Sequence, residues 1–334
     1  MAQYEKNMTG YVKDYTQHLR QAVEIGKRAR FDVSGREFHN IVVTGLGGSG
    51  IGGTIVSQLV QDQLKIPMLV NNDYQLPAYV GEHSLVIVSS YSGNTEETLS
   101  AMEIAMERGA EIACITAGGK VKDLAEEKGF NFIQIPGGIP PRGSFGLNSP
   151  QLLYVLHQYG FINDTFEKDL LDAADAIDAN EEAIQQEARG IAEQVHGTVP
   201  IIYSDAAYQG VSIRLRQQIN ENAKMLCWHH VFPEMNHNEL VGWAGGDERF
   251  SVIMMRTEGD HFRTQMRMNL CKSIFKKHTD KVFEIHAKGE NVIERSYYLI
   301  HVGDWLSVIL ADLNGVDAIE VDVIDYLKGE LAKN

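Results

Sequence analysis

The sequence has few of the features that support a disulfide framework or a zinc knuckle. Its three cysteines, Cys114, Cys227 and Cys271, lie far apart inside apolar segments of the 334-residue chain, with no Cys-x-x-Cys spacing. Disulfide-rich domains and zinc sites space their cysteines closely. We therefore expect buried thiols, and no motif supports a catalytic cysteine.

Long apolar runs and clustered positive charge are also missing. No stretch approaches the roughly 20 apolar residues that span a bilayer. The N-terminus, "MAQYEKNMTGYVKDY", has charges and hydroxyls where a signal peptide has an apolar segment. The formal net charge is −15, whereas nucleic acids and anionic membranes attract clusters of Lys and Arg. We predict a cytoplasmic protein with no nucleic-acid or membrane partner, in which local groups hold any anionic ligand.

Short apolar segments rich in β-branched residues alternate with helical patterns along most of the chain. The expected strands begin near residues 41, 67, 85, 111 and 131, and again near 198, 250 and 281. The expected helices lie near 4–30, 50–63, 94–108, 120–128, 208–224, 260–277 and 291–313. Because the apolar character of the strands is continuous rather than alternating, we predict parallel sheets covered by helices on both faces.

An acidic helical stretch from about 164 to 196 separates the two runs of alternating elements. We therefore predict an α/β protein with two doubly wound parallel-sheet domains. The N-terminal domain with its helical arm covers residues 1–160, the connector 161–196 and the C-terminal domain 197–334. The alternation of strands and helices restarts in the second half, as expected for a diverged copy of the first.

The segment "GLGGSGIGG", residues 45–53, links the first expected strand to a helix. Gly45, Gly47 and Gly50 fit the dinucleotide fingerprint Gly-x-Gly-x-x-Gly, and Asp73 stands where a nicotinamide enzyme would hold the ribose. Glycines let the backbone approach an anion, and a helix N-terminus offers free N–H groups. The segment predicts a bound phosphate and leaves open whether the phosphate belongs to a dinucleotide.

The third expected strand ends in "SSYSGNTEET", residues 89–98, where hydroxyl side chains crowd at the start of a helix. Ligands gather at the carboxyl ends of strands in open α/β sheets. Hydroxyl and N–H groups there can surround a terminal phosphomonoester without Lys or Arg. Two such loops on neighbouring strands fit one compact phosphate better than an extended dinucleotide. We also expect Asn94 or Thr95 to cap the helix.

Four motifs resemble those of a known family. "SYSGNTEET" resembles the phosphosugar-binding signature of sugar isomerase (SIS) domains. "PPRGSFG" from residue 140, "QINENAK" around Glu221 and "PEMNHNELVGW" from residue 233 follow it in the chain. In this order, over nearly the whole chain, they resemble the bifunctional phosphoglucose/phosphomannose isomerases. The resemblance implies two flavodoxin-like SIS domains, a sugar 6-phosphate substrate, no cofactor or metal, and a homodimer.

The resemblance also implies roles for particular residues. The phosphate anchor would consist of Gly48, Ser49, Ser90, Ser92 and Thr95.

Four further residues would carry the chemistry. Glu221 would shuttle the proton between carbons 1 and 2, as a carboxylate can. His237, which the partner subunit could supply, would open the sugar ring, because imidazole titrates near neutral pH. Arg142, on a turn stiffened by two prolines, would face the enediolate, and Lys328 would help ring opening.

Each assignment has a plainer alternative. Glu221 could be an exposed helical residue paired with Lys224, His237 a core or capping residue, Arg142 a surface arginine, and Lys328 a solvated lysine. The cluster His229, His230, Glu234 and His237 also admits a metal site, although its spacing matches no standard pattern.

One segment departs from the family. Where it usually has a proline-stiffened, threonine-bearing segment, this chain has Ala318, Ile319 and Glu320. The expected reaction interconverts glucose 6-phosphate and fructose 6-phosphate, and mannose 6-phosphate as well, through an enediolate. The departure concerns tolerance at carbon 2, so it leaves open whether mannose 6-phosphate is accepted beside glucose 6-phosphate. The same chemistry would serve glycolysis and mannose supply. A phosphosugar sensor without turnover and a nicotinamide dehydrogenase are the competing hypotheses.

Overall fold

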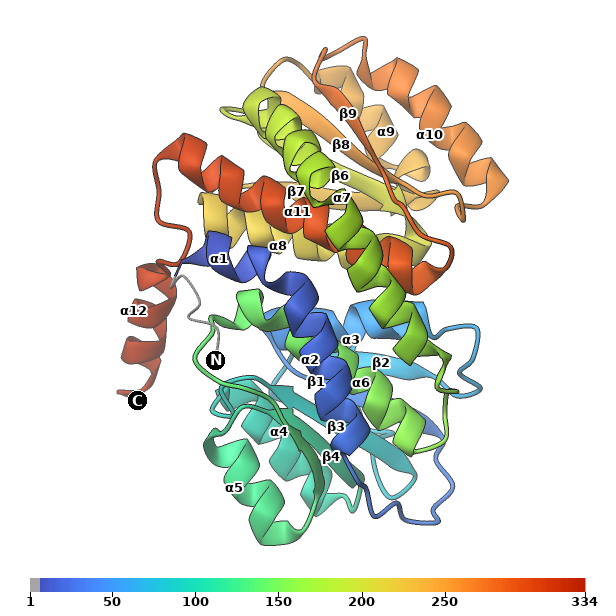
Figure 1. Cartoon of the computed structure of the whole chain (residues 1–334), viewed down its shortest axis with the longest axis vertical. Coiled ribbons are helices and arrows are strands. Elements are labelled where there is room, and N and C mark those ends of the chain that lie inside the picture. Colours follow the sequence, from blue (N-terminus) through green and yellow to red (C-terminus); the bar gives the residue numbers. More distant parts are fainter. Residues whose placement is uncertain (1–6, 334) are drawn as a thin grey trace.

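Two parallel sheets lie one above the other, with a layer of helices between them (Figure 1). The computed structural model describes residues 7–333. The long helix α7 (Thr165–Val195) extends from one sheet to the other, in the stretch where the sequence predicted a helical connector. It packs on α11 (Val292–Asn314) and on α2 (Tyr15–Arg28). Of the expected helical arm at 4–30, residues 4–6 lie outside the described residues, and the rest forms α1 (Met8–Lys13) and α2.

The first sheet has the strand order β2-β1-β3-β4-β5, all parallel. Its strands are β1 (Asn40–Thr44), β2 (Met68–Asn71), β3 (Ser84–Ser90), β4 (Glu111–Thr116) and β5 (Asn131–Gln134). Helices α3 (Gly47–Leu59), α4 (Glu96–Glu107) and α5 (Gly119–Lys128) follow β1, β3 and β4. Every residue of β1 and β3 is buried, which confirms the prediction of strands covered on both faces. This is the flavodoxin-like order, whose ligand crevice lies at the switch point between β1 and β3.

The second sheet repeats this order over four parallel strands, β7-β6-β8-β9. Its strands are β6 (Val199–Asp205), β7 (Trp228–Phe232), β8 (Phe250–Arg256) and β9 (Val282–His286). The longer helices are α8 (Gln209–Ala223), α10 (Phe262–Phe275) and α11. Short helical turns η2 (Ala206–Tyr208), η3 (Glu234–His237), α9 (Glu239–Gly242) and η4 (Trp243–Gly245) connect them. The two sheets therefore share an architecture, as the repeated rhythm of the sequence indicated.

The sequence analysis missed three elements. Strand β7 lies at the edge of its sheet, and its first three residues are only partly covered, so "WHHVF" lacks the apolar run of the other strands. Helix α6 (Phe145–Gln158) is buried on all sides and contains Pro150, which together remove the amphipathic pattern. Helix α12 (Asp322–Leu331) has the opposite character, because it has no buried residue among those described.

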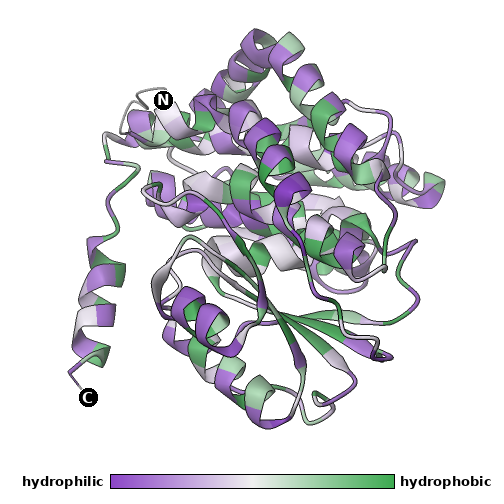
Figure 2. Cartoon of the chain, turned by 60° about the horizontal axis from the view of Figure 1, so that its bottom comes forward, coloured by the Kyte–Doolittle hydropathy of each residue, from purple (hydrophilic) through white to green (hydrophobic). Residues whose placement is uncertain are grey.

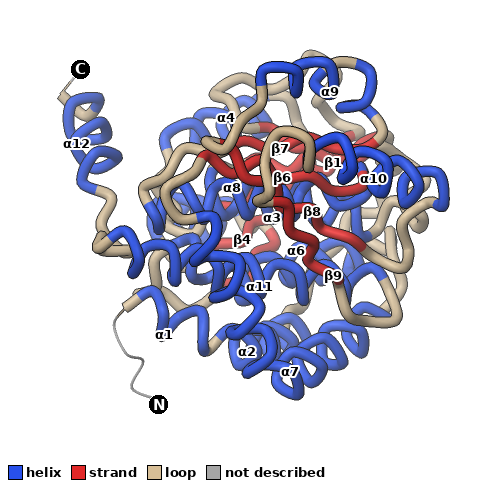
Figure 3. Tube along the Cα trace, turned by 90° about the horizontal axis from the view of Figure 1, so that it is seen from above, coloured by secondary structure: helices blue, strands red, loops and turns tan. Residues whose placement is uncertain are grey.

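Helix α12 stands apart from the rest of the molecule at the end of the chain (Figures 2 and 3). Both views show it beside the body, joined to α11 by an extended segment, whereas the strands lie at the centre under helices. Its side chains Val323, Tyr326 and Leu327 are more than half exposed. Contacts other than a packed apolar face must therefore hold α12 in place.

The three cysteines are free thiols. Cys114 and Cys271 are buried as expected, whereas Cys227 is half-buried. Burial raises the pKa of Cys114 and that of Cys227 to about 12. Thiolates are the nucleophilic form of cysteine, so these two side chains are inert near neutral pH.

None of the helices within residues 7–333 combines the length and the apolar character needed to cross a membrane. The two longest, α7 and α11, instead pack against each other inside the protein.

His18 makes the stability of the fold depend on pH. This side chain of α2 is fully buried, and burial lowers the pKa of its imidazole to about 4. Below pH 6.5 the imidazole of His18 binds a proton in the unfolded chain but not in the folded chain. The free energy of unfolding therefore falls as the pH falls towards 4. We expect this one residue to lower the free energy of unfolding by about 2 kcal/mol between pH 7.5 and pH 4.5.

Urea denaturation of the native protein and of a His18→Gln variant across this range measures the effect. The variant lacks the group that titrates, so it should lose about 2 kcal/mol less than the native protein on acidification. Equal losses in both proteins would mean that His18 binds its proton in the folded state.

Candidate functional site

The loops that follow β1 and β3 touch at the switch point of the first sheet. Ser49, near the start of α3, is buried there. Its hydroxyl oxygen accepts hydrogen bonds from the backbone N–H of Tyr91 at 3.3 Å and from Nδ2 of Asn148 at 3.2 Å. Because both lone pairs of the oxygen are engaged, the hydroxyl hydrogen is left to donate to a ligand.

The loop from Ser90 to Thr95 is held together by its own hydroxyl groups. The hydroxyl oxygens of Ser90 and Thr95 lie 3.1 Å apart, and that of Ser90 also accepts from the N–H of Gly93 at 3.2 Å. The exposed Ser92 accepts from the N–H of Asn94 at 3.2 Å. Gly93 has a φ of 67°, and a Cβ there would lie 1.7 Å from the carbonyl oxygen of Gly118, so only glycine fits.

The start of α4 is uncapped, which contradicts our prediction that Asn94 or Thr95 caps it. Thr95 has the N-cap position, but its side chain makes no capping bond within the described chain, because its hydroxyl pairs with Ser90. The side-chain oxygen of Asn94 accepts from the N–H of Lys120 instead, at 3.1 Å. The first N–H groups of α4 and the positive end of its dipole are therefore available to an anion.

Two helical starts of the second sheet are capped by side chains. After β6, the carboxylate of Asp205 accepts from the N–H of Ala207 at 2.9 Å at the start of η2, and before α10, Nδ1 of His261 accepts from the N–H of Arg263 at 3.2 Å. Helix α8, which continues from η2, has no capping side chain of its own among the described residues, and neither have α3 and α4. The turn after β6 thus carries a carboxylate, whereas the turn after β1 carries none.

Gly48 connects the phosphate loops to the turn that carries Arg142. A Cβ on Gly48 would lie 3.0 Å from the carbonyl oxygen of Pro141, in the turn η1 (Pro141–Ser144). Arg142 follows directly and is only 6% exposed. It is therefore a buried residue, and the surface alternative for it is wrong.

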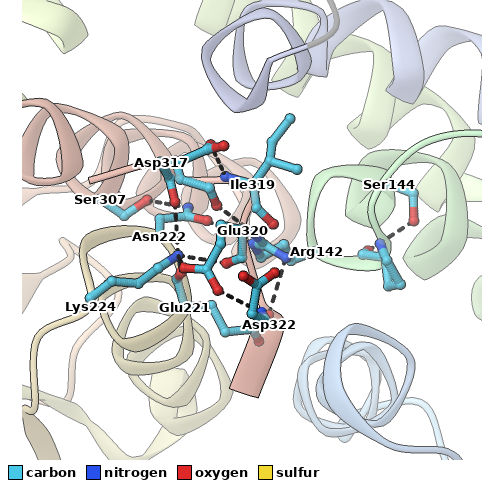
Figure 4. A network of polar contacts seen from close by, with 12 residues as sticks. Arg142, Ser144, Glu221, Asn222, Lys224, Ser307, Asp317, Ile319, Glu320 and Asp322 are labelled. Carbon is cyan, nitrogen blue, oxygen red and sulfur yellow. Dashed lines mark hydrogen bonds and ion pairs between the residues drawn. The ribbon is translucent and has the colours of Figure 1, made fainter. Parts of the chain in front are cut away.

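The guanidinium of Arg142 reaches into the second half of the chain (Figure 4). Its Nε donates to Oδ1 of Asn222 at 2.7 Å, and one terminal nitrogen donates to the carbonyl oxygens of Ala318 and, at 3.0 Å, Ile319. Burial lowers the pKa of Arg142, while the carboxylates of Glu221, Asp317 and Glu320 act in the opposite direction.

Glu221, at the end of α8, pairs with Arg142. Its Oε2 lies 3.3 Å from the second terminal nitrogen of the guanidinium, and its side chain is 31% exposed. The Lys224 ammonium lies close as well, but it donates to the backbone carbonyl of Glu221, at 2.7 Å, while the carboxylate pairs with Arg142. A carboxylate and a cation thus lie side by side, with the carboxylate open to solvent.

Two clefts flank helix α12. The first, of about 500 Å³, is lined by Ser92 and Thr95 of the serine loop and by Lys328 of α12. The second, of about 420 Å³, is lined by Glu221 and Lys224. Ile324 lines both. The structure thus brings Lys328 to the same cleft as the serine loop, and it places Glu221 on the other side of the same helix.

The structure does not bring His237 to these residues. His237 is exposed and ends the turn η3, beyond the carboxyl end of β7, whereas Glu221 precedes the start of that strand. The five residues of β7 alone span about 16 Å. Within one described chain, His237 and Glu221 lie at opposite ends of a strand.

The remaining alternatives find little support in the geometry. Residues 7–333 hold no group of three or more His, Cys, Asp or Glu side chains placed to bind a metal ion. His229 and His230 are consecutive in β7, so their side chains point to opposite faces of the sheet. The carboxylate of Asp73 accepts a hydrogen bond from the N–H of Tyr74 at 2.6 Å, which engages it locally rather than in a ribose site.

Comparison with known proteins identifies the family. The description "Bacterial phospho-glucose isomerase C-terminal SIS domain" matches residues 184–331, and "SIS domain" matches residues 36–134. A bifunctional phosphoglucose/phosphomannose isomerase from Caldicellulosiruptor bescii is 38% identical over an alignment of 332 residues, gaps included, that covers 96% of this chain and 98% of the relative. This chain belongs to the bifunctional phosphoglucose/phosphomannose isomerase family. The member from Aquifex aeolicus is 37% identical over 300 residues, 89% of this chain and 92% of that one.

Solved structures agree on the fold of this family member. Tagatose-6-phosphate ketose/aldose isomerase from Escherichia coli superposes with a TM-score of 0.70 over 96% of this chain and 97% of its own, at 16% identity. At so low an identity the likeness shows a shared fold. The predicted family and the two-sheet SIS architecture are confirmed.

Several residues around Arg142 were not identified from the isomerase motifs. Asn222 orients the guanidinium, and Nδ2 of Asn222 in turn donates to the hydroxyl of Ser307 at 2.9 Å. Arg214, which pairs with the carboxylate of Asp304 at 2.7 Å, donates to the carbonyl oxygen of Arg142 at 3.2 Å. Asn222 lies within "QINENAK", so its place beside Glu221 was the available signal. Ser307, Arg214 and Asp304 have no such signal, because their contacts join segments that are far apart in the sequence.

Thr95→Val tests the anchor. Valine keeps the shape of the side chain but removes the hydroxyl that pairs with Ser90, so we expect the dissociation constant for inorganic phosphate to rise about tenfold, as loss of one charged hydrogen bond does. Ser57→Ala is the matched control, because the Ser57 hydroxyl donates to the carbonyl oxygen of Thr54 within α3. Titration calorimetry measures both variants. If Thr95→Val and Ser57→Ala bound inorganic phosphate with equal affinity, the phosphate would lie at another site.

Proposed function

We propose that the protein interconverts glucose 6-phosphate and fructose 6-phosphate, and also mannose 6-phosphate, by proton transfer through an enediolate. The observation that carries the proposal is the pairing of Glu221 with the buried Arg142, next to two helices whose N-termini are open. The aldose and ketose sugars share one enediolate, and glucose and mannose 6-phosphate differ in the face of carbon 2 that carries the proton. A single carboxylate therefore serves each interconversion when the enediolate turns either face of carbon 2 towards it. Membership of the isomerase family supports the proposal.

In the proposed mechanism the phosphate binds at the switch point of the first sheet. The N–H groups that begin α3 and α4 donate to its oxygens, together with the hydroxyls of Ser49, Ser90, Ser92 and Thr95. Gly48 lets the sugar approach the backbone. Lys328, across the same cleft, adds a positive charge near the sugar ring and assists its opening.

Glu221 then moves the proton. Its carboxylate takes the proton from carbon 2 of the open-chain aldose, and the electron pair of that bond forms the enediolate, with the negative charge on the oxygen of carbon 1. The proton of the carbon-2 hydroxyl passes to that oxygen, and the same carboxyl group returns its proton to carbon 1, which leaves the carbonyl on carbon 2. Arg142 stabilises the negative oxygen of that intermediate. Four of its five N–H groups face Asn222, Ala318, Ile319 and Glu221, so one N–H on the nitrogen beside Glu221 remains for the substrate.

Glu221→Gln tests the proton transfer. Glutamine keeps the size of the side chain but cannot accept the proton, so we expect kcat to fall by about a thousandfold or more. Glu193→Gln, on the exposed surface of α7, should leave the rate unchanged. The rates are measured with all three sugar phosphates in the presence of EDTA, because the proposed mechanism uses side chains alone. Absence of turnover by the native protein, or a full rate in the Glu221 variant, would contradict the proposal.

We further propose a homodimer in which His237 of each subunit completes the site of its partner. The support is geometric: His237 is exposed and stands at the far end of β7 from Glu221 of its own chain. We also propose a cytoplasmic location, because three free thiols suit a reducing compartment.

Mixed dimers test the shared site. Glu221→Gln and His237→Asn each inactivate a homodimer under the proposal. When equal amounts are mixed and allowed to exchange subunits, half of the dimers are hybrids, and each hybrid holds one native site. We therefore expect about a quarter of the native activity to return. If both residues served the same subunit's site, every site would remain defective and mixing would restore nothing.

A further inference from the structure

Lys224 has a backbone conformation that a lysine rarely adopts. It ends α8 with φ 57° and ψ 34°, in the left-handed region, and among residues 7–333 it is the one non-glycine residue with a positive φ. Helices α5 and α11 end in the same conformation with Gly129 and Gly315. Glycine adopts this conformation without the steric cost that a Cβ brings. A lysine at this position therefore indicates that its side chain is needed.

The side chain of Lys224 joins two segments far apart in the sequence. Its ammonium donates to the carbonyl oxygens of Glu221 at 2.7 Å, Asp317 at 2.9 Å and Glu320 at 2.7 Å. An ammonium group has three N–H bonds, and these three acceptors use them all. The carboxylate of Glu320 lies 3.8 Å away and adds a weak ion pair. Figure 4 shows Lys224 between the end of α8 and the segment 317–320.

The segment 317–320 is also the attachment of α12. It accepts the hydrogen bonds of Arg142 at Ala318 and Ile319, and α12 begins two residues after Glu320. Because α12 buries none of its described residues, its position depends on this segment. The ammonium of Lys224 thus links two parts of the molecule. One is the end of α8 with Glu221, and the other is the segment that binds Arg142 and leads into α12 with Lys328.

We propose that Lys224 is a positioning residue, which clamps the segment 317–320 onto the end of α8 and so holds Glu221, Arg142 and α12 in register for proton transfer. The inference rests on the proposed function, but the clamp itself can be tested without turnover. The clamp acts on the geometry of the reacting groups, whereas the serine loop that anchors the phosphate lies on other elements.

Three variants separate the effect of the Lys224 ammonium from the effect of its left-handed backbone. Lys224→Met keeps the length of the side chain and the strained backbone but removes the donors. Lys224→Gly removes the donors and relieves the backbone. Lys272→Met is the matched control: the Lys272 side chain is 33% exposed against 28% for Lys224, and its ammonium pairs with Glu284 in the second sheet.

Hydrogen exchange of the peptide 317–331 is the first measurement. We expect exchange to be at least about tenfold faster in both Lys224 variants than in the native protein and in Lys272→Met, because each lost charged hydrogen bond is worth that factor. The second measurement is steady-state kinetics. We expect kcat to fall at least about tenfold in both Lys224 variants, with KM changed less than about threefold.

Thermal unfolding is the third measurement. Lys224→Gly should melt about 2 °C higher than Lys224→Met, since glycine suits the left-handed position, and yet be no more active. Native exchange rates in both Lys224 variants would overturn the clamp, and so would a native kcat in either. A native protein that turns over none of the three sugar phosphates would contradict the proposed function, while the exchange measurement would still test the clamp.

Discussion

The buried guanidinium of Arg142 links the two halves of this protein. Burying a cation is unfavourable unless it is paired and hydrogen-bonded. Here the partners are a side chain of α8, a carboxylate on the same helix and two backbone carbonyls that follow α11. The arginine itself comes from the turn that packs on the glycine loop of the first sheet. The loops of the first sheet and the carboxylate of Glu221 are therefore positioned relative to each other through one side chain, which the proposed function requires of a phosphate anchor and a base.

Under the proposed function, the two sheets contribute different ends of their helices to the site. In the first sheet the open N-termini of α3 and α4 suit an anion, so a chain with a net charge of −15 offers a phosphate the positive ends of two helices without clustered basic residues. In the second sheet the C-terminal end of α8 carries the carboxylate of Glu221 and is followed by Lys224.

Much of this arrangement could be predicted from the sequence because its signals are local. Continuous apolar strands, glycines before a helix and crowded hydroxyls report on their immediate neighbours, and they led to the sheets, the order of the loops and the family. The assignments of Ser49, Thr95 and Glu221 needed more, because they came from the resemblance of whole motifs to the isomerase family. The elements that were missed lack a local pattern: β7 is an edge strand, and α6 has no polar face. The partners of Arg142 and Lys224 are largely backbone carbonyls, which every residue carries and which no sequence pattern marks.

Asp205 makes the turn after β6 electrostatically different from the turn after β1. Its carboxylate accepts from the N–H of Ala207 and puts a negative charge at the carboxyl end of β6, whereas β1 is followed by the uncharged residues that lead into α3. A carboxylate repels an anionic ligand and already engages a donor that such a ligand would need. Two sheets with the same strand order therefore differ in the sign of charge that they tolerate at matching turns.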